Sequence, residues 1–66
     1  MFILVEDFDN NVVFEGEADD FLFENDNDYE LENILDDLEL KNFGESIRVS
    51  NDDNNYIITK VDELIY

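Results

Sequence analysis

The chain of 66 residues contains no cysteine and no histidine, and its only basic residues are Lys41, Arg48 and Lys60. Without cysteine it can form neither a disulfide nor a thiolate metal site, and without histidine it lacks the commonest general base and metal ligand. Twenty acidic residues against three bases give a formal net charge of −17. Nucleic acid and anionic membranes both need cationic patches, so this charge excludes them as direct ligands.

Proline is also absent and glycine occurs only twice, so no Pro-rich or Gly/Ser-rich linker divides the chain. We therefore expect residues 1–66 to form a single domain, near the lower size limit for folding without disulfides, a metal or a partner. The first apolar run, MFILVEDFD, has no basic residue before it and acids directly after it. This pattern predicts neither a signal peptide nor a membrane span, and a cytoplasmic protein is the expectation.

Hydrophobic residues make up 44% of the chain, with six Phe and three Tyr among them, which predicts a folded core in spite of the charge. The acids are unevenly placed. Residues 1–40 contain fifteen acids and no base, whereas residues 41–66 contain five acids and all three bases. The acidity therefore belongs to the first two-thirds of the chain, and it favours a basic partner or a cation.

Short apolar and alternating runs predict strands at Phe2–Asp7 and Asn11–Glu17, joined by a tight turn within FDNNV. Gly16 marks either a bulge or the end of the second strand. The run FLFE predicts a short third strand at Phe21–Glu24.

The segment DNDYELENILDDLELKN, residues 26–42, predicts an amphipathic helix. Leu31, Ile34, Leu35 and Leu38 follow the i, i+3, i+4, i+7 spacing of one apolar stripe. Asn27 and Glu30 have the spacing of a capping box, and Gly44 is placed to close the helix.

After Gly44 the pattern changes to alternation, which predicts a strand through Ile47 and Val49, a turn at residues 50–55, and a strand at Tyr56–Val61. The tail DELIY is apolar enough to pack back on the domain. The expected fold class is α+β: a small antiparallel sheet of four or five strands with one amphipathic helix packed on it. The element order is strand, strand, an optional strand, helix, strand, strand.

Acidic loops suggest calcium, but neither candidate loop fits the EF-hand pattern. The loop that begins at Asp7 has Val12 at the glycine position and Ala18 at the bidentate glutamate position. The loop that begins at Asp52 reaches Glu63 at position 12, but Tyr56 and Ile57 occupy a ligand position and the glycine position. No dedicated metal site and no cofactor is predicted. Weak divalent binding remains an alternative at Asp26, Asp28 and Glu30, or at Asp52 and Asp53.

An enzyme is not predicted. A pair of carboxylates can act as general acid and base only when both are fixed across a cleft with separated pKa values, and a chain of this length has little room for such a cleft. Ser46, Ser50 and Thr59 have no histidine and no suitably placed lysine to activate them.

The acidic face of the predicted helix is the main candidate site. Seven carboxylates between Asp26 and Glu39, over roughly 20 Å of helix, give one charge per about 3 Å, close to the roughly 3.4 Å of a single DNA strand. Pairs such as Glu32 and Asp36 should each cost about 0.2 to 0.5 kcal/mol. Solubility does not require this, because a net charge of about 2 to 8 suffices for a small domain.

We therefore predict a partner-binding surface made of the acids in residues 15–39, with acids before residue 26 forming a second row. Its residues are Glu15, Glu17, Asp19, Asp20, Glu24, Asp26, Asp28, Tyr29, Glu30, Glu32, Asp36, Asp37 and Glu39. Tyr29 or Phe43 would supply hot-spot area beside the charges.

In size, charge and α+β pattern the chain resembles the small acidic DNA mimics of bacteriophages and mobile elements, which include anti-CRISPR, anti-restriction and uracil-DNA glycosylase inhibitor proteins. The resemblance rests on the acid runs EGEADD, ENDNDYELE and DDLE, at residues 15–20, 24–32 and 36–39. It implies a viral protein in the host cytoplasm that occupies the basic nucleic-acid channel of a nuclease or another DNA enzyme and competes with its substrate.

Two alternatives stay open at this point. One is an acidic interaction module or regulator that binds a basic partner without displacing nucleic acid. The other is a calcium-dependent structural component. A homodimer is a further hypothesis, because a small core gains from a shared interface and a dimer would double the length of the charge array.

Overall fold

The structure is a computed structural model, and it describes residues 1–50 and 55–62. Along the chain these residues form two strands, two helices and two strands: β1 (Phe2–Asp7), β2 (Val12–Glu17), α1 (Ala18–Glu24), α2 (Tyr29–Glu39), β3 (Ser46–Ser50) and β4 (Asn55–Val61). The four strands make one sheet in the order β2-β1-β4-β3, and every neighbouring pair is antiparallel. The α+β class predicted from the sequence is confirmed.

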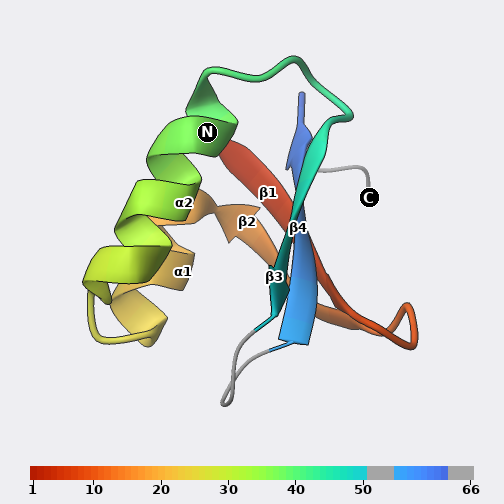
Figure 1. Cartoon of the computed structure of the whole chain (residues 1–66), viewed down its shortest axis with the longest axis horizontal. Coiled ribbons are helices and arrows are strands. Elements are labelled where there is room, and N and C mark those ends of the chain that lie inside the picture. The colour runs from red at the N-terminus through yellow and green to blue at the C-terminus, as the bar shows by residue number, and fades with distance from the viewer. Residues whose placement is uncertain (51–54, 63–66) are drawn as a thin grey trace.

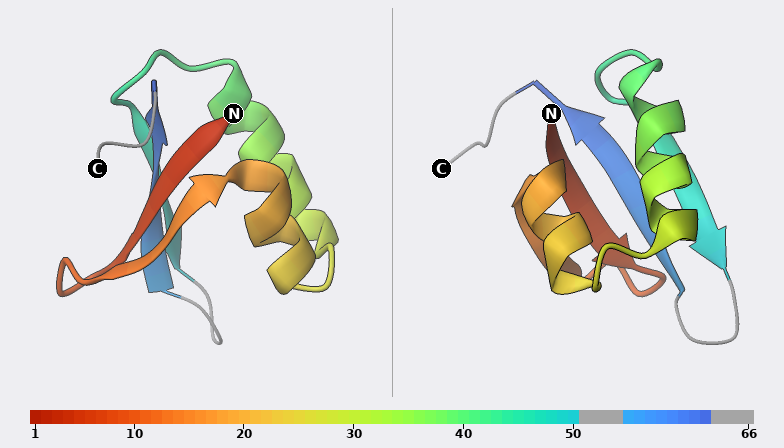
Figure 2. Two further views of the ribbon diagram at one scale, coloured as in Figure 1. Left: turned by 180° about the vertical axis from the view of Figure 1, so that it is seen from behind. Right: turned by 90° about the vertical axis from the view of Figure 1, so that its left-hand side faces the viewer.

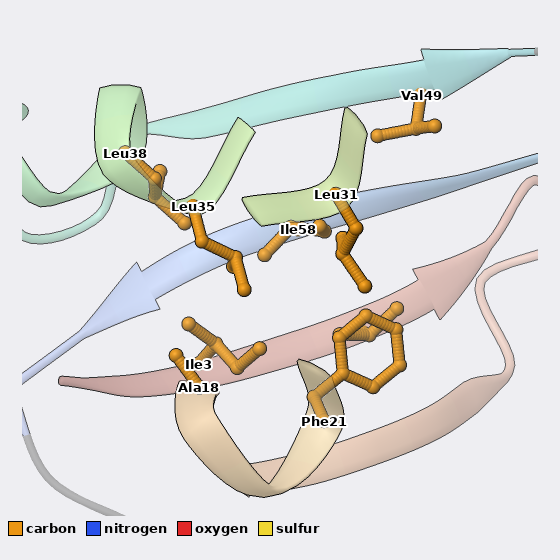
Figure 3. Packing of buried hydrophobic residues seen from close by; sticks show 9 residues of the cluster. Ile3, Ala18, Phe21, Leu31, Leu35, Leu38, Val49 and Ile58 are labelled. Atoms are coloured by element: carbon orange, nitrogen blue, oxygen red, sulfur yellow. The ribbon is translucent and has the colours of Figure 1, made fainter. Parts of the chain in front are cut away.

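Both helices pack on the same face of the sheet, so the described part of the molecule has two layers (Figures 1 and 2). Strand residues alternate between the two faces. Ile3 and Val5 of β1 and Ile58 of β4 point toward the helices and are completely buried. The same layer of side chains contains the apolar faces of α1 and α2 (Figure 3). The core consists of Ile3, Val5, Ala18, Phe21, Leu31, Leu35, Leu38, Val49 and Ile58.

The first hairpin forms as the sequence predicts. The Asp7 carboxylate accepts hydrogen bonds of 2.9 Å from the backbone N–H groups of Asp9 and Asn11, and Asn10 adopts a positive φ of 66° in the turn. Asn is among the few residues that tolerate this conformation. The strand register skips Val13, so the bulge lies there and not at Gly16. Gly16 pairs with Ile3, one residue before β2 ends at Glu17, as the other alternative for Gly16 predicted.

The predicted third strand at Phe21–Glu24 is wrong, and so is the prediction of a single helix. These residues belong to α1, which begins directly after β2. Ala18, Phe21 and Leu22 have the i, i+3, i+4 spacing of a helix face, and Ala18 and Phe21 are buried. The Phe21 ring lies 4.9 Å from that of Phe14 on β2. This packing overrides the strand preference of the aromatic residues.

The apolar stripe of α2 is confirmed, because Leu31, Leu35 and Leu38 are buried and Ile34 packs against the core. The predicted capping box is wrong. The N-cap is Asp28, whose carboxylate accepts a 3.0 Å hydrogen bond from the backbone N–H of Leu31. Asn27 instead adopts a positive φ of 54° in the turn that joins the two helices.

The sequence suggested that Gly44 closes α2, but the structure shows that it does not. The helix ends at Glu39 with Leu40 as its C-cap, four residues before Gly44. Gly44 has a φ of 90°, and its N–H donates a 2.7 Å hydrogen bond to the carbonyl of Lys60, where the chain enters the second hairpin. That hairpin, β3 and β4, is confirmed. Of the turn predicted at residues 50–55, Ser50 belongs to β3 and Asn55 to β4, and residues 51–54 lie outside the described residues. Residues 63–66 of the tail DELIY, which was predicted to pack back, also lie outside them.

Candidate functional site: an acidic groove between two helices

The carboxylates of α2 fall into two rows on either side of its buried stripe. At 100° per residue, Glu32, Asp36 and Glu39 lie on one flank of the helix, and Glu30 and Asp37 lie on the other. All five are exposed. The predicted single acidic face is therefore two rows, because Leu31, Leu35 and Leu38 occupy the sheet-facing side between them.

The helix α1 contributes three more exposed acids, Asp19, Asp20 and Glu24, and lies beside α2 on the sheet (Figure 2). Between the two helices runs a cavity of about 210 Å³, which we call the interhelical groove. Four carboxylates line it, together with an apolar floor. The lining residues are Met1, Ala18, Asp19, Leu22, Glu32, Leu35, Asp36 and Glu39. The groove thus places one acid of α1, Asp19, beside the Glu32–Asp36–Glu39 row of α2.

The lining of the interhelical groove matches one class of ligand. Arginine and lysine side chains carry a charged head on an aliphatic stem, and they commonly bury the stem on apolar surface while the head meets a carboxylate. Among the described residues, no group of three carboxylates is close enough to hold a metal ion. The groove offers carboxylates for the head of such a side chain and apolar contact along its floor for the stem.

A second, smaller cavity of about 150 Å³ lies on the other flank of α2, between this helix and the β3–β4 hairpin. Asn25, Asp28, Glu30 and Tyr56 contribute polar groups to it, over an apolar wall of Leu31, Ile34 and Val49. Burial raises the pKa of the Tyr56 hydroxyl, and the negative charges of Asp28 and Glu30 raise it further. The carboxylates of Asp28 and Glu30, at the start of α2, therefore favour the protonated form of Tyr56 across this cavity.

Two residues of the predicted second row lie elsewhere. Glu15 and Glu17 alternate along β2 with Phe14 and Gly16, which pair with the buried residues Val5 and Ile3, so the two glutamate side chains point to the face of the sheet away from the helices. Glu17 also forms an ion pair of 3.2 Å with the N-terminal ammonium group. The structure thus brings Asp19 together with Glu32, Asp36 and Glu39 of α2, whereas Asp20 and Glu24 lie on the outer side of α1 and Glu15 and Glu17 on the other face of the sheet.

Asp26 and Asp28 lie in the turn between the helices. The carboxylate of Asp28 is engaged as the N-cap, so part of its acceptor capacity serves the fold. Tyr29, the predicted anchor, is 77% exposed at the start of α2.

Phe23 is a second exposed aromatic of the helical layer that the sequence did not single out. It is 75% exposed, and its spacing from Asp19 and Asp20 places it on the outer, acidic face of α1. The sequence contains this spacing, but the spacing places residues on one face only in a helix, and a strand was predicted at FLFE. Phe43, the other predicted anchor, is exposed beyond α2, with the Lys60 ammonium 5.3 Å from its ring centre.

The basic residues of the chain do not neutralise this acidic layer. The Lys60 ammonium donates to the backbone carbonyls of Glu39 and Lys41, and the Arg48 guanidinium lies 4.3 Å from the centre of the Phe8 ring. Within residues 1–50 and 55–62, the ion pair of Glu17 with the N-terminus is the single one. The carboxylates of α1 and α2 therefore keep their charge uncompensated among the described residues.

No known protein family, curated protein or solved structure matches the chain. In the part of the chain that the structure describes, neither helix has the length and apolarity needed to cross a membrane.

Proposed function

We propose that the protein is an acidic DNA-mimic inhibitor that occupies the basic nucleic-acid-binding channel of a bacterial defence or DNA-processing enzyme, of the anti-CRISPR or anti-restriction type. The observation that carries the proposal is the uncompensated charge of the helical layer. The 11 residues of α2 carry five carboxylates over about 16 Å, so that its two rows taken together have one charge per about 3.3 Å of helix. A single DNA strand carries one charge per about 3.4 Å.

The interhelical groove supports the same proposal. A channel that binds DNA presents Arg and Lys side chains, and the groove offers four carboxylates over an apolar floor for such side chains. Tyr29 and Phe23 stand exposed beside the acids, where they would add buried aromatic area to the contact. The charge itself would steer the protein to a basic channel and raise the association rate.

The cost to the fold also supports a role in binding. Glu32 and Asp36 on α2, and Asp20 and Glu24 on α1, are like-charged pairs at i, i+4, each costing about 0.2 to 0.5 kcal/mol. Glu39 lies in the last turn of α2, where the helix dipole favours a cation. Contact of these acids with a basic partner would offset this cost in the complex.

Capture from a bacterial lysate on immobilised protein, followed by elution with duplex DNA, tests the proposal. We expect a basic DNA-binding enzyme to be captured and then released by DNA, because both ligands need the same channel. If the captured enzyme binds DNA while it still holds this protein, mimicry is wrong, and the acidic interaction module is the better account. If capture requires Ca²⁺, the calcium-dependent alternative replaces both.

A further inference from the structure

The cavity between α2 and the β3–β4 hairpin has a volume of about 150 Å³, and we call it the hairpin cavity. At about 30 Å³ for each water molecule, it has room for roughly five waters or for an organic group of that size. Leu31 of α2 and Val49 of β3 are buried and form an apolar floor (Figure 3). Asp28 and Glu30 are exposed and form a charged rim. The hairpin cavity thus combines apolar surface with carboxylates at its opening.

The polar groups of the hairpin cavity are mainly hydrogen-bond acceptors. The carboxylates of Asp28 and Glu30 can only accept, and one Asp28 oxygen is already used to cap α2. The side-chain amino group of Asn25 donates a 2.8 Å hydrogen bond to the backbone carbonyl of Phe21, so its carbonyl oxygen is left as an acceptor. The Tyr56 hydroxyl can both donate and accept. A ligand that complements this lining is therefore rich in donors.

The charge of the hairpin cavity favours a cation. Asp28 and Glu30 both raise the pKa of the Tyr56 hydroxyl, so their negative charges reach the opposite wall of the cavity. The N-terminus of α2 opposes a cation here, but its dipole is equivalent to only about half a positive charge, less than the two carboxylates. A donor-rich organic cation thus matches both the charge and the hydrogen-bonding groups of the lining.

We propose that the hairpin cavity binds the guanidinium group of an arginine side chain in a protein partner. A guanidinium group carries five N–H donors and no acceptor, whereas a lysine ammonium group carries three donors. Its flat faces are weakly hydrated, so they and the aliphatic stem can lie on the floor formed by Leu31 and Val49. The net charge of −17 favours a basic protein as the source of the arginine. This inference is independent of DNA mimicry, because it does not depend on what else the partner binds.

An NMR titration of the full chain with Nα-acetyl-arginine amide tests the inference, in about 0.15 M NaCl, where the Debye length is about 8 Å. We expect saturable shifts of the methyl signals of Leu31, Ile34 and Val49, with a dissociation constant on the order of millimolar. Nα-acetyl-citrulline amide has nearly the same shape without the charge and should produce no saturable shift. Nα-acetyl-lysine amide should bind several-fold more weakly, because it has fewer donors.

Three variants locate the binding site. Glu30→Gln removes one of the two charges of the rim and should weaken binding of the arginine derivative about tenfold. Tyr56→Phe removes the hydroxyl but keeps the ring, and should weaken binding several-fold. Asp37→Asn is the matched control, because Asp37 lies on the same flank of α2, about 10 Å further along the helix, and the change in charge is the same. It should change the affinity less than twofold.

The dispersion of the amide signals shows whether each variant is folded, so lost binding is separated from lost structure. The inference is wrong if the methyl shifts do not saturate, or if the citrulline or the lysine derivative binds as tightly as the arginine derivative. It is also wrong if Asp37→Asn weakens binding as much as Glu30→Gln, since net charge alone would then account for the affinity.

Discussion

The ammonium group of Lys60 on β4 donates a 2.7 Å hydrogen bond to the backbone carbonyl of Glu39, the last residue of α2. It donates a second, of 2.8 Å, to the carbonyl of Lys41. The last carbonyls of a helix have no intrahelical partners, and the helix dipole favours a cation beside them. One of the three bases of the chain therefore fixes the end of the acidic helix on the sheet, while the acidic side chains keep their charge.

Lys60→Met should lower the free energy of unfolding by about 1 to 3 kcal/mol, because two charge-assisted hydrogen bonds to α2 are lost. Urea unfolding measures this change. Lys41→Met is the matched control, since it removes the same charge from an exposed side chain. If the two variants lose equal stability, net charge is responsible and the cap formed by Lys60 contributes nothing.

Salt should stabilise the protein. Repulsion among the acids of α1 and α2 destabilises the fold by about 1 to 2 kcal/mol, and salt screens it. Because 1 kcal/mol corresponds to about 4 to 8 °C in a domain of this size, the Tm should rise by several degrees between low and moderate NaCl. A melting temperature that does not change would mean that the acids are already compensated. A rise with millimolar Ca²⁺ at constant ionic strength would indicate bound cations.

Neutralising Asp36 should stabilise the fold while it weakens binding to a basic partner. Asp36→Asn removes the repulsion with Glu32 one turn away, which should raise the free energy of unfolding by about 0.2 to 0.5 kcal/mol. It also removes one of the four carboxylates of the interhelical groove. Asp9→Asn, in the turn between β1 and β2, is the control with the same change in charge and should affect binding less. Equal losses of affinity would mean that net charge alone, and not the groove, decides binding.

The ionisation of Tyr56 should make stability depend on pH in the alkaline range. Its pKa is raised in the folded protein by burial and by the charges of Asp28 and Glu30, so the folded state holds this proton longer than the unfolded state. The free energy of unfolding should therefore fall as pH rises from about 10, the unfolded value, through the folded pKa. Tyr56→Phe keeps the ring against Phe21 and should fall less steeply in urea unfolding above pH 10. Equal slopes would contradict this effect of the cavity.

The sequence predicted those elements whose pattern is local. The stripe of Leu31, Leu35 and Leu38 repeats with the period of an α-helix. Both hairpins join strands that are close in the chain, so the pairing of these strands follows from the turns. The pairing of β1 with β4 joins Phe2 to Val61, and no short-range signal marks such a contact. The strand order could therefore not be read from the sequence.

The candidate site was predicted only in part, and the reason is related. Residues 21–24 consist of three apolar residues and one acid, and so short a run fits a strand or a helix equally well. What decides for the helix is the packing of Phe21 between Phe14 and Tyr56, which come from two strands. Because residues 18–24 form a helix, Asp19 lines the interhelical groove, whereas Glu15 and Glu17 lie on the other face of the sheet. The acids were visible in the sequence, but their division between two faces depends on the fold.

The most direct test of the central claim is a competition titration with the captured enzyme. The apparent dissociation constant of the enzyme for labelled duplex DNA is measured at increasing concentrations of this protein, in constant salt. If the helical layer occupies the DNA channel, the apparent constant rises linearly with the concentration of the protein, without a plateau. Asp36→Asn should reduce the slope more than Asp9→Asn. A plateau would show that enzyme, DNA and protein form a ternary complex, and it would contradict the claim that this protein acts as a DNA mimic.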